Sequence, residues 1–278
     1  MPMPMPMPVS VSVSVSVSLS PWPYPFWIAH RGAGKLAPEN TLAAFRIGAS
    51  HGWRAFECDV KLSREGVPFL LHDDRLDRTT PRTGLAADFD WAELTRLDAG
   101  GWHGRAFAGE PPASLEAVAR FVLRNGHALN VELKPSPGQE WQTGHAIGLA
   151  CLDLWRDAPV PPVQPAPPLF TSFKPEALRG ARDSAPALPR ALLLDTLWPD
   201  WCATAQDLGC VAVVTHHSLM DAPLIDQLQG AGLRALCYTV NDPADASRRM
   251  VLGVDGLISD AVDVFAPAWP SSMKTWPA

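Results

Sequence analysis

The sequence predicts an α/β fold: a (β/α)8 barrel of the TIM type with a small insertion after its third strand. Short apolar runs alternate with helix-like segments from residue 26 onward. Most of these runs are nearly continuous, as parallel strands covered on both faces require. Eight runs can be counted, and eight alternating units imply closure into a barrel. An open, doubly wound sheet has the same periodicity and is the alternative architecture.

Strands and helices follow one another in regular order. Asn40 is a favourable N-cap for a helix over Thr41–His51, and Ser114 opens a helix over Leu115–Arg124. The eight expected strands are Phe26–His30, Ala55–Val60, Pro68–Asp73, Ala128–Lys134, Leu169–Phe173, Arg190–Asp195, Cys210–His217 and Ala235–Asn241.

One connection is much longer than the others. About 40 residues separate the third expected strand from Ser114, whereas βα loops usually have about 2–6 residues. This segment, residues 74–113, has a helix start of its own, because Asp90 and Glu93 form a D-x-x-E capping box. We expect it to form the insertion, on the side of the barrel where substrates bind.

The two ends of the chain differ from the barrel region. The opening MPMPMPMPVSVSVSVSVSLS is a dipeptide repeat with no basic residue before Arg31, so it does not resemble a secretory signal. We expect a disordered tail over residues 1–25, dispensable for the barrel, whether or not residues 1–20 belong to the native protein. One barrel domain over residues 26–265 and a C-terminal tail over 266–278 complete the organisation.

Composition restricts the partners. The net charge of −6 argues against nucleic acid or an anionic membrane as a partner, and no apolar run reaches the ~18 residues that a membrane span needs. The cysteines show no CxxC pairing, which favours reduced thiols and a cytoplasmic location. They are Cys58, Cys151, Cys202, Cys210 and Cys237. The oligomeric state is not indicated.

Acidic residues gather at the carboxyl ends of expected strands. Glu57 and Asp59 are two apart and therefore share a face of one strand, as do Glu132 and Lys134 on another. Buried acids need a cation, because an unpaired buried charge is very unfavourable. Three carboxylates make an oxygen site for one divalent cation, Mg²⁺ or Ca²⁺ with Mn²⁺ possible, and Lys134 beside them suits a phosphoryl oxygen.

Histidines end two of the strands. His30 ends the first expected strand and His72 lies near the end of the third, where they are candidates for a general acid and base. Taken singly, each of these polar residues has a structural explanation, and Glu39 could serve only the positive end of the helix beginning near Thr41. Their concurrence at one end of successive strands favours a functional site.

Several segments resemble the glycerophosphodiester phosphodiesterase family. HRGAGKLAPENTLAAF (residues 30–45) resembles the family's HRG…PENT signature, and ECDVKLSREGVPFLLHDDRLDRTT (residues 57–80) resembles the E-x-D, HD and L-x-R-T-T pattern that follows it. NVELK (residues 130–134) resembles the N-x-E-x-K strand, while TSF (171–173) and DGLISD (255–260) match weaker signatures.

The resemblance implies hydrolysis of a small glycerophosphodiester to glycerol 3-phosphate and an alcohol through a cyclic phosphate. It implies His30 and His72 as the acid/base pair, Arg31 and Lys134 as phosphate contacts, and a metal site built from the three carboxylates. The family commonly has W-T-V-N in its last strand, whereas this chain has Tyr238 in place of the tryptophan, which alters the wall that holds the substrate.

Other interpretations remain. His216 and His217 end the seventh expected strand and could approach the ligand. A lysophospholipase D-like activity on the same fold would need an apolar groove, which Trp91, Trp102 and Phe107 of the insertion could supply. A barrel that binds phosphodiesters without catalysis is the alternative from another class, and the presence of both His30 and His72 argues against it.

Overall fold

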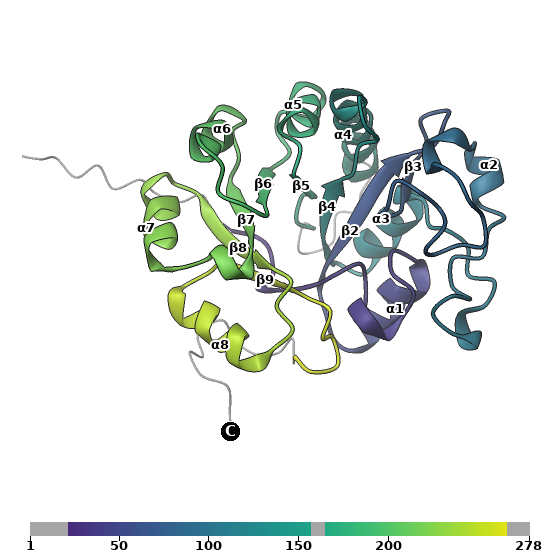
Figure 1. Ribbon diagram of the computed structural model, residues 1–278, viewed down its shortest axis with the longest axis horizontal. Coiled ribbons are helices and arrows are strands. Elements are labelled where there is room, and N and C mark those ends of the chain that lie inside the picture. Colours follow the sequence, from purple (N-terminus) through teal and green to yellow (C-terminus); the bar gives the residue numbers. More distant parts are fainter. Residues whose placement is uncertain (1–21, 157–164, 266–278) are drawn as a thin grey trace, which may run out of the picture.

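Parallel strands that are apolar on both faces need helices outside and a packed interior, and the chain meets both needs by closing its sheet into a barrel (Figure 1). The computed structural model describes residues 22–156 and 165–265. Residues 1–21 of the N-terminal tail expected over residues 1–25, and the whole C-terminal tail expected over 266–278, lie outside the described residues. The (β/α)8 prediction is confirmed.

Eight parallel strands make the ring, in the order in which they follow along the chain. They are β1 Trp27–Ala29, β2 Ala55–Leu62, β4 Ala128–Leu133, β5 Leu169–Ser172, β6 Arg190–Leu194, β7 Ala212–His216, β8 Arg234–Tyr238 and β9 Gly256–Ser259. Strand β1 pairs with both β9 and β2, which closes the ring.

Helices surround the ring (Figure 1). They are α1 Leu42–Ser50, α2 Trp91–Leu94, α3 Leu115–Arg124, α4 Glu140–Arg156, α5 Pro175–Ser184, α6 Trp201–Asp207, α7 Ala222–Gly230 and α8 Pro243–Leu252. Short 3-10 turns are η1 Gly34–Leu36, η2 Ala86–Asp88, η3 Arg105–Phe107 and η4 His217–Leu219. No helix in the described part of the chain is long and apolar enough to span a membrane.

The third expected strand does not belong to the ring. Pro68–Leu70 forms β3, which pairs antiparallel with the C-terminal end of β2. Only five residues separate Leu62 from Pro68, and so short a connection permits a hairpin but not the crossover that a parallel strand requires. The eighth ring strand is instead β9, whose four residues form too short an apolar run to stand out in the sequence.

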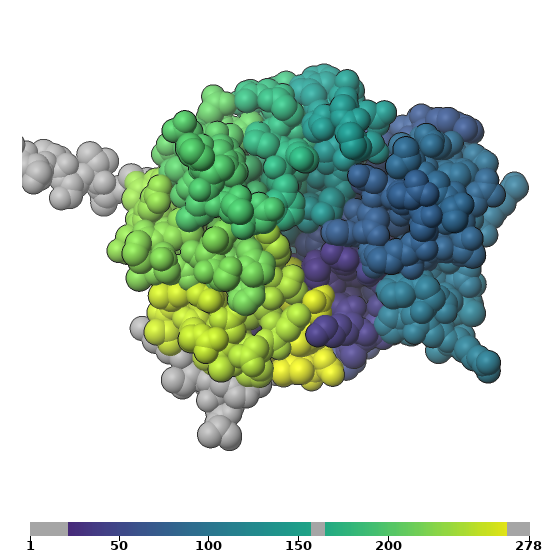
Figure 2. Space-filling model, in the orientation of Figure 1, coloured from purple at the N-terminus to yellow at the C-terminus, as the bar shows by residue number. Residues whose placement is uncertain are grey.

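The insertion covers the segment between β3 and α3. It contains η2, α2 and η3, and the capping box predicted at Asp90 and Glu93 is present at the start of α2. Its buried Leu76 and Leu94 pack with Phe69 in a small core of their own. In the space-filling view the insertion forms the blue lobe beside the rounded barrel (Figure 2).

Inside the barrel, side chains change from apolar to polar along the strands. Ala55 belongs to an apolar floor, and Glu57 and Asp59 follow it on the same face of β2. Asn130 and Glu132 follow Ala128 in the same way on β4. The floor consists of Ile28, Ala55, Ala128, Leu169, Ala191, Leu193, Ala212, Val214, Leu236 and Ile258, with Tyr24. Polar groups therefore collect at the carboxyl ends of the strands.

Tyr24 packs against the apolar floor of the barrel. Its side chain is 9% exposed, packs with the floor residues and meets the Trp22 ring edge-on at 4.7 Å between centroids. The packed region therefore begins by Trp22, several residues before the boundary at residue 26 that we expected from the sequence.

Tyr24→Ala should destabilise the protein by about 3 kcal/mol, because it opens a cavity under the barrel floor. The melting temperature should fall by roughly 6–12 °C in thermal unfolding. Tyr24→Phe is the matched control, since the hydroxyl has no hydrogen-bond partner among the described residues. A chain beginning at Pro25 should resemble Tyr24→Ala, and equal melting temperatures for all variants would show that this packing contributes nothing.

Candidate active site

Three buried carboxylates form the centre of the site. Glu57 and Asp59 come from β2 and Glu132 from β4, where Asp59 and Glu132 are register partners. One oxygen from each carboxylate lies within 4.8 Å of the others, and each residue is at most 8% exposed. Among the described residues, Oε1 of Glu57 and Oδ1 of Asp59 have no hydrogen-bond partner, although Lys134 Nζ lies 3.5 Å from Oδ1 of Asp59. Acidic oxygens that converge in this way fit a divalent cation.

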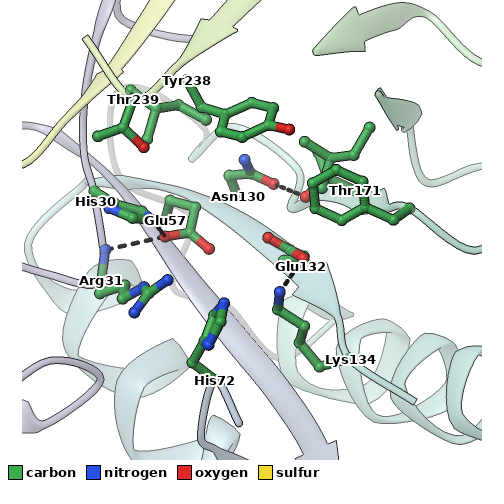
Figure 3. A pocket seen from close by; sticks show the side chains of 13 residues that line it. His30, Arg31, Glu57, His72, Asn130, Glu132, Lys134, Thr171, Tyr238 and Thr239 are labelled. Carbon is green, nitrogen blue, oxygen red and sulfur yellow. Dashed lines mark hydrogen bonds and ion pairs between the residues drawn. The ribbon is translucent and has the colours of Figure 1, made fainter. Parts of the chain in front are cut away.

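Two basic residues flank the carboxylates (Figure 3). Lys134 Nζ lies 2.7 Å from Glu132 Oε1 and 3.5 Å from Asp59 Oδ1. Arg31 Nε lies 3.3 Å from Asp59 Oδ2, and its backbone N–H donates to Glu57 Oε2 at 3.0 Å. Arg31 and Lys134 thus stand on two sides of the acidic cluster, with part of each side chain open to the pocket.

The backbone at Arg31 is strained into place. Arg31 has φ 51°, a left-handed conformation that non-glycine residues rarely adopt, and Gly32 follows with φ 97°. A Cβ on Gly32 would lie 2.9 Å from the Ala44 Cβ and 3.0 Å from the Phe45 nitrogen of α1. Glycine at this position lets α1 pack closely, and the turn directs the Arg31 backbone N–H at Glu57.

Each histidine is held by an aspartate. His30 Nδ1 lies 2.6 Å from Asp260 Oδ1, and Asn241 donates to the other oxygen of Asp260 at 3.0 Å. His72 Nδ1 lies 2.7 Å from Asp73 Oδ1. Both rings line the same pocket (Figure 3). Since Nδ1 is engaged in each ring, Nε2 is the atom left for a ligand.

The hairpin explains how His72 reaches this pocket. Because β3 runs back along β2, the Leu71 N–H donates to the carbonyl of Asp59 at 3.0 Å. The next residue, His72, therefore lies beside the carboxylates, although it follows β3, which is outside the ring.

The pocket is a cavity of about 160 Å³. Its lining residues are His30, Arg31, Glu57, His72, Asn130, Glu132, Lys134, Thr171, Phe173, Leu193, Tyr238, Thr239 and Ile258. Two aromatic residues form one wall of the pocket: Tyr238 meets Phe173 edge-on at 5.7 Å between centroids, and the Tyr238 hydroxyl donates to the Leu194 carbonyl at 3.2 Å. Lys134 Nζ lies 5.6 Å from the centre of the Phe173 ring. The pocket can hold a small anionic ligand with one apolar side.

The structure brings all eight predicted site residues together. Seven line the pocket, and Asp59 lies in the carboxylate cluster beside it. His216 and His217 are outside the lining: His216 packs edge-on against Tyr238, and His217 pairs with Asp245 at 2.5 Å.

The aromatic residues of the insertion do not form a groove. Trp91 packs against Phe69, and Phe107 packs against the small cluster of Ala33, Ala37 and Ala44. Trp102 is 45% exposed, so it is the one of the three expected aromatics with a large free surface.

Asn40 has a different role from the one expected. Thr41 caps α1, its side chain accepting from the Ala44 N–H, whereas Asn40 has φ 60° and turns toward the site. Its amide donates to Asp59 Oδ2 at 2.8 Å and accepts from the Asp59 N–H at 3.1 Å. Asn40 is part of the PENT segment of the sequence, but only its long-range contact with Asp59 shows that it positions that carboxylate.

Burial and mutual repulsion determine the carboxyl pKa values. Burial and then the Asp59 charge raise the pKa of Glu57 to about 8 and that of Glu132 to about 7. For Asp59, burial would raise the pKa, but Arg31, Lys134 and Asn40 outweigh it and the pKa falls. Near neutral pH the cation-free cluster therefore keeps most of a proton on Glu57 and part of one on Glu132, and a cation would displace them.

The histidine pKa values shift in opposite directions. Burial alone would lower the pKa of His30, but the hydrogen bond to Asp260 and the charge of Glu57 raise it overall. For His72, burial lowers the pKa. The charge of Asp59 opposes this shift, but the charges of Lys134 and Arg31 lower the pKa further, and it falls overall. The two rings therefore differ in proton affinity within one pocket.

Known proteins are similar along nearly the whole barrel. A sequence model of the Glycerophosphoryl diester phosphodiesterase family matches residues 30–264. The glycerophosphodiester phosphodiesterase of Caldanaerobacter subterraneus subsp. tengcongensis is 30% identical over 237 residues, covering 84% of this chain and 93% of that protein. YhdW of Bacillus subtilis (strain 168) is 31% identical over 253 residues, covering 85% and 94%.

A solved structure is similar in fold and sequence. A phosphodiesterase from Oleispira antarctica, in complex with the product sn-glycerol-3-phosphate, superposes with a TM-score of 0.79 at 34% identity. The match covers 86% of this chain and 94% of that one.

Stabilisation by a divalent cation should increase with pH. The folded pKa values of Glu57 and Glu132, about 8 and about 7, exceed the ordinary value of 4.5. Between pH 4.5 and 8 the folded protein therefore binds more protons than the unfolded chain, and without a cation its stability falls as the pH rises. A bound cation removes this loss of stability. Below these pKa values the affinity for the cation should weaken about tenfold per pH unit for each proton that the cation has to displace.

The measurement is the melting temperature with saturating Mg²⁺, Ca²⁺ or Mn²⁺ and with a chelator, at pH 6 and pH 8. The cation-dependent increase should be larger at pH 8, and Glu132→Gln should reduce the increase. An equal or larger increase at pH 6 would contradict the carboxylate assignment.

Proposed function

Because the chain belongs to the glycerophosphoryl diester phosphodiesterase family and is a phosphodiesterase of that kind, we propose that it hydrolyses small glycerophosphodiesters to glycerol 3-phosphate and an alcohol with one divalent cation. The observation that carries this proposal is the meeting of three buried carboxylates, two basic residues and two aspartate-held histidines around one cavity. The product complex of the Oleispira antarctica phosphodiesterase supports glycerol 3-phosphate as the product.

Glu57, Asp59 and Glu132 would hold the cation, which is Mg²⁺ or Ca²⁺, with Mn²⁺ a possible substitute, because all three ligands are carboxylate oxygens. Such a cation would supply Lewis-acid charge to the phosphodiester and would lower the pKa of the attacking hydroxyl. Arg31 and Lys134 bind the remaining phosphoryl oxygens, where negative charge increases in the transition state. Both are already held beside Asp59, so little reorganisation is needed.

His30 and His72 transfer the protons. One Nε2 takes a proton from the attacking hydroxyl, and the other gives a proton to the oxygen of the departing alcohol. Asp260 and Asp73 hold the Nδ1 atoms, which fixes each tautomer and keeps Nε2 available. The phosphorus–oxygen bond to the alcohol breaks as the bond to the attacking oxygen forms.

The attacking group is the 2-hydroxyl of the substrate's own glycerol. It closes a five-membered cyclic phosphate, and such intramolecular attack has a large effective-molarity advantage over water. Water then opens the ring with the roles of the two histidines reversed. The small cavity, with Tyr238 and Phe173 on its apolar side, suits glycerol better than a long acyl chain.

A cytoplasmic location is also proposed. All five cysteines are free, and four of them are buried, which is consistent with a reducing compartment.

The purified protein should release glycerol 3-phosphate from several glycerophosphodiesters, detected by a coupled assay. Exhaustive chelation should abolish turnover, and Mg²⁺, Ca²⁺ or Mn²⁺ should restore it. His30→Ala and His72→Ala should each lower kcat by about 10²–10⁴-fold, whereas His217→Ala, outside the pocket, should act like the wild type. Full activity after chelation would disprove the metal requirement.

The 1,3-propanediol analogue of the substrate should bind without being cleaved. It keeps the phosphodiester and the terminal hydroxyl but lacks the 2-hydroxyl that closes the cyclic phosphate. The analogue should inhibit competitively, and a cyclic phosphate should be detectable by ³¹P NMR during turnover of the true substrate. Hydrolysis of the analogue at a comparable rate would make an activated water the nucleophile.

A further inference from the structure

Arg78 has no part in the reaction proposed above, yet its guanidinium joins two carboxylates beside the pocket. Nη1 and Nη2 donate to the two oxygens of Glu39 at 2.7 Å each. Nε donates to Oδ2 of Asp73 at 2.6 Å. Paired contacts of this kind are the strongest geometry that an arginine makes with carboxylates.

Each of these carboxylates also holds a group that faces the pocket. Glu39 Oε1 accepts from Nη1 of Arg31 at 2.9 Å, and Asp73 Oδ1 lies 2.7 Å from Nδ1 of His72. Nη2 of Arg78 reaches both of these shared oxygens, at 2.7 Å and 3.2 Å. A single nitrogen therefore connects the support of Arg31 to the support of His72.

The loop that carries Arg78 has other anchors. The Leu76 side chain is 1% exposed, and the Thr80 hydroxyl donates to the Leu76 carbonyl at 2.8 Å. Lys61, buried at the outer end of β2, donates to Asp74 at 2.7 Å. These contacts hold the backbone on both sides of Arg78, whose own side chain is 43% exposed. Because the loop is anchored without Arg78, the ion pairs of this arginine are not needed to hold the backbone in place.

We propose that Arg78 is a positioning residue that aligns Arg31 and His72 with each other through Glu39 and Asp73. This inference rests on the proposed function, in which Arg31 binds the phosphate and His72 transfers a proton. Charges alternate along the chain of contacts from Arg31 through Glu39 and Arg78 to Asp73. Lysine cannot replace Arg78, because its single nitrogen cannot reproduce paired contacts with two carboxylates.

The first test is steady-state kinetics of variants along the network. Arg78→Ala should lower kcat/KM by about 10–100-fold, as loss of a supporting partner commonly does, and Arg78→Lys should recover little. Glu39→Gln should act mainly on KM through Arg31, and Asp73→Asn mainly on kcat through His72, while Arg78→Ala changes both. Combining Arg78→Ala with either variant should be less than additive, because the residues share contacts.

Chemical rescue separates positioning from a general structural role. Guanidinium ion added to Arg78→Ala should restore part of kcat without changing the melting temperature. Arg75→Ala is the matched control: Arg75 lies in the same loop, is 56% exposed and pairs with Asp77. It should keep wild-type kinetics and gain nothing from guanidinium.

The outcomes distinguish the two proposals. If the wild type releases glycerol 3-phosphate and Arg78→Ala matches Arg75→Ala, the inference is wrong and the proposed function stands. Loss of activity in Arg78→Ala together with a lower melting temperature, and no rescue by guanidinium, would also overturn the inference. A wild-type protein that releases no glycerol 3-phosphate would disprove the proposed function and the inference with it.

Discussion

Repulsion among three buried carboxylates is the constraint around which this end of the barrel is organised. Glu57, Asp59 and Glu132 approach within 4.8 Å of one another in a region that water scarcely reaches. Arg31 and Lys134 offset part of this charge, and protons or a divalent cation must offset the rest. The strained backbone at Arg31 is understandable in this light, since it brings a backbone N–H to the acid that lies deepest in the pocket.

Much of this arrangement could be predicted from the sequence because strand periodicity is local information. Residues two apart on a strand share a face, so E-x-D and E-x-K patterns after apolar runs indicate polar side chains at the carboxyl ends of the strands, above an apolar floor. Ala55 and Ala128 lie in that floor, with Glu57 and Glu132 above them. The same local rules predicted the caps at Ser114 and Asp90. The count of eight units also predicted closure into a ring, although one counted strand, β3, lies outside the ring and β9 takes its place.

Contacts between distant residues could not be predicted in this way. The sequence did not indicate that Asp260 would hold His30, because 230 positions separate them and the short β9 is hard to recognise. Asn40 has the composition of a helix cap, yet its left-handed backbone turns it toward Asp59. The third apolar run has the appearance of a ring strand, and only the five-residue connection before it favours a hairpin. For Asn40 a local preference was overridden by a partner elsewhere in the fold, whereas Asp260 is too far from His30 in the sequence for any local pattern to connect them.

The two histidines depend on the fold to different extents. His72 is held by the adjacent Asp73, within a hairpin and loop that are local in sequence. His30 is held by Asp260, which follows β9, and β9 reaches β1 only when the ring closes. The side chain of Asn241, after β8, fixes Asp260 in turn: its Nδ2 donates to the Asp260 carboxylate, and its Oδ1 accepts from the Asp260 backbone N–H. One half of the acid/base pair is thus assembled by a local turn and the other by closure of the barrel, so a chain in which β9 has not docked would present His72 but leave His30 without its partner.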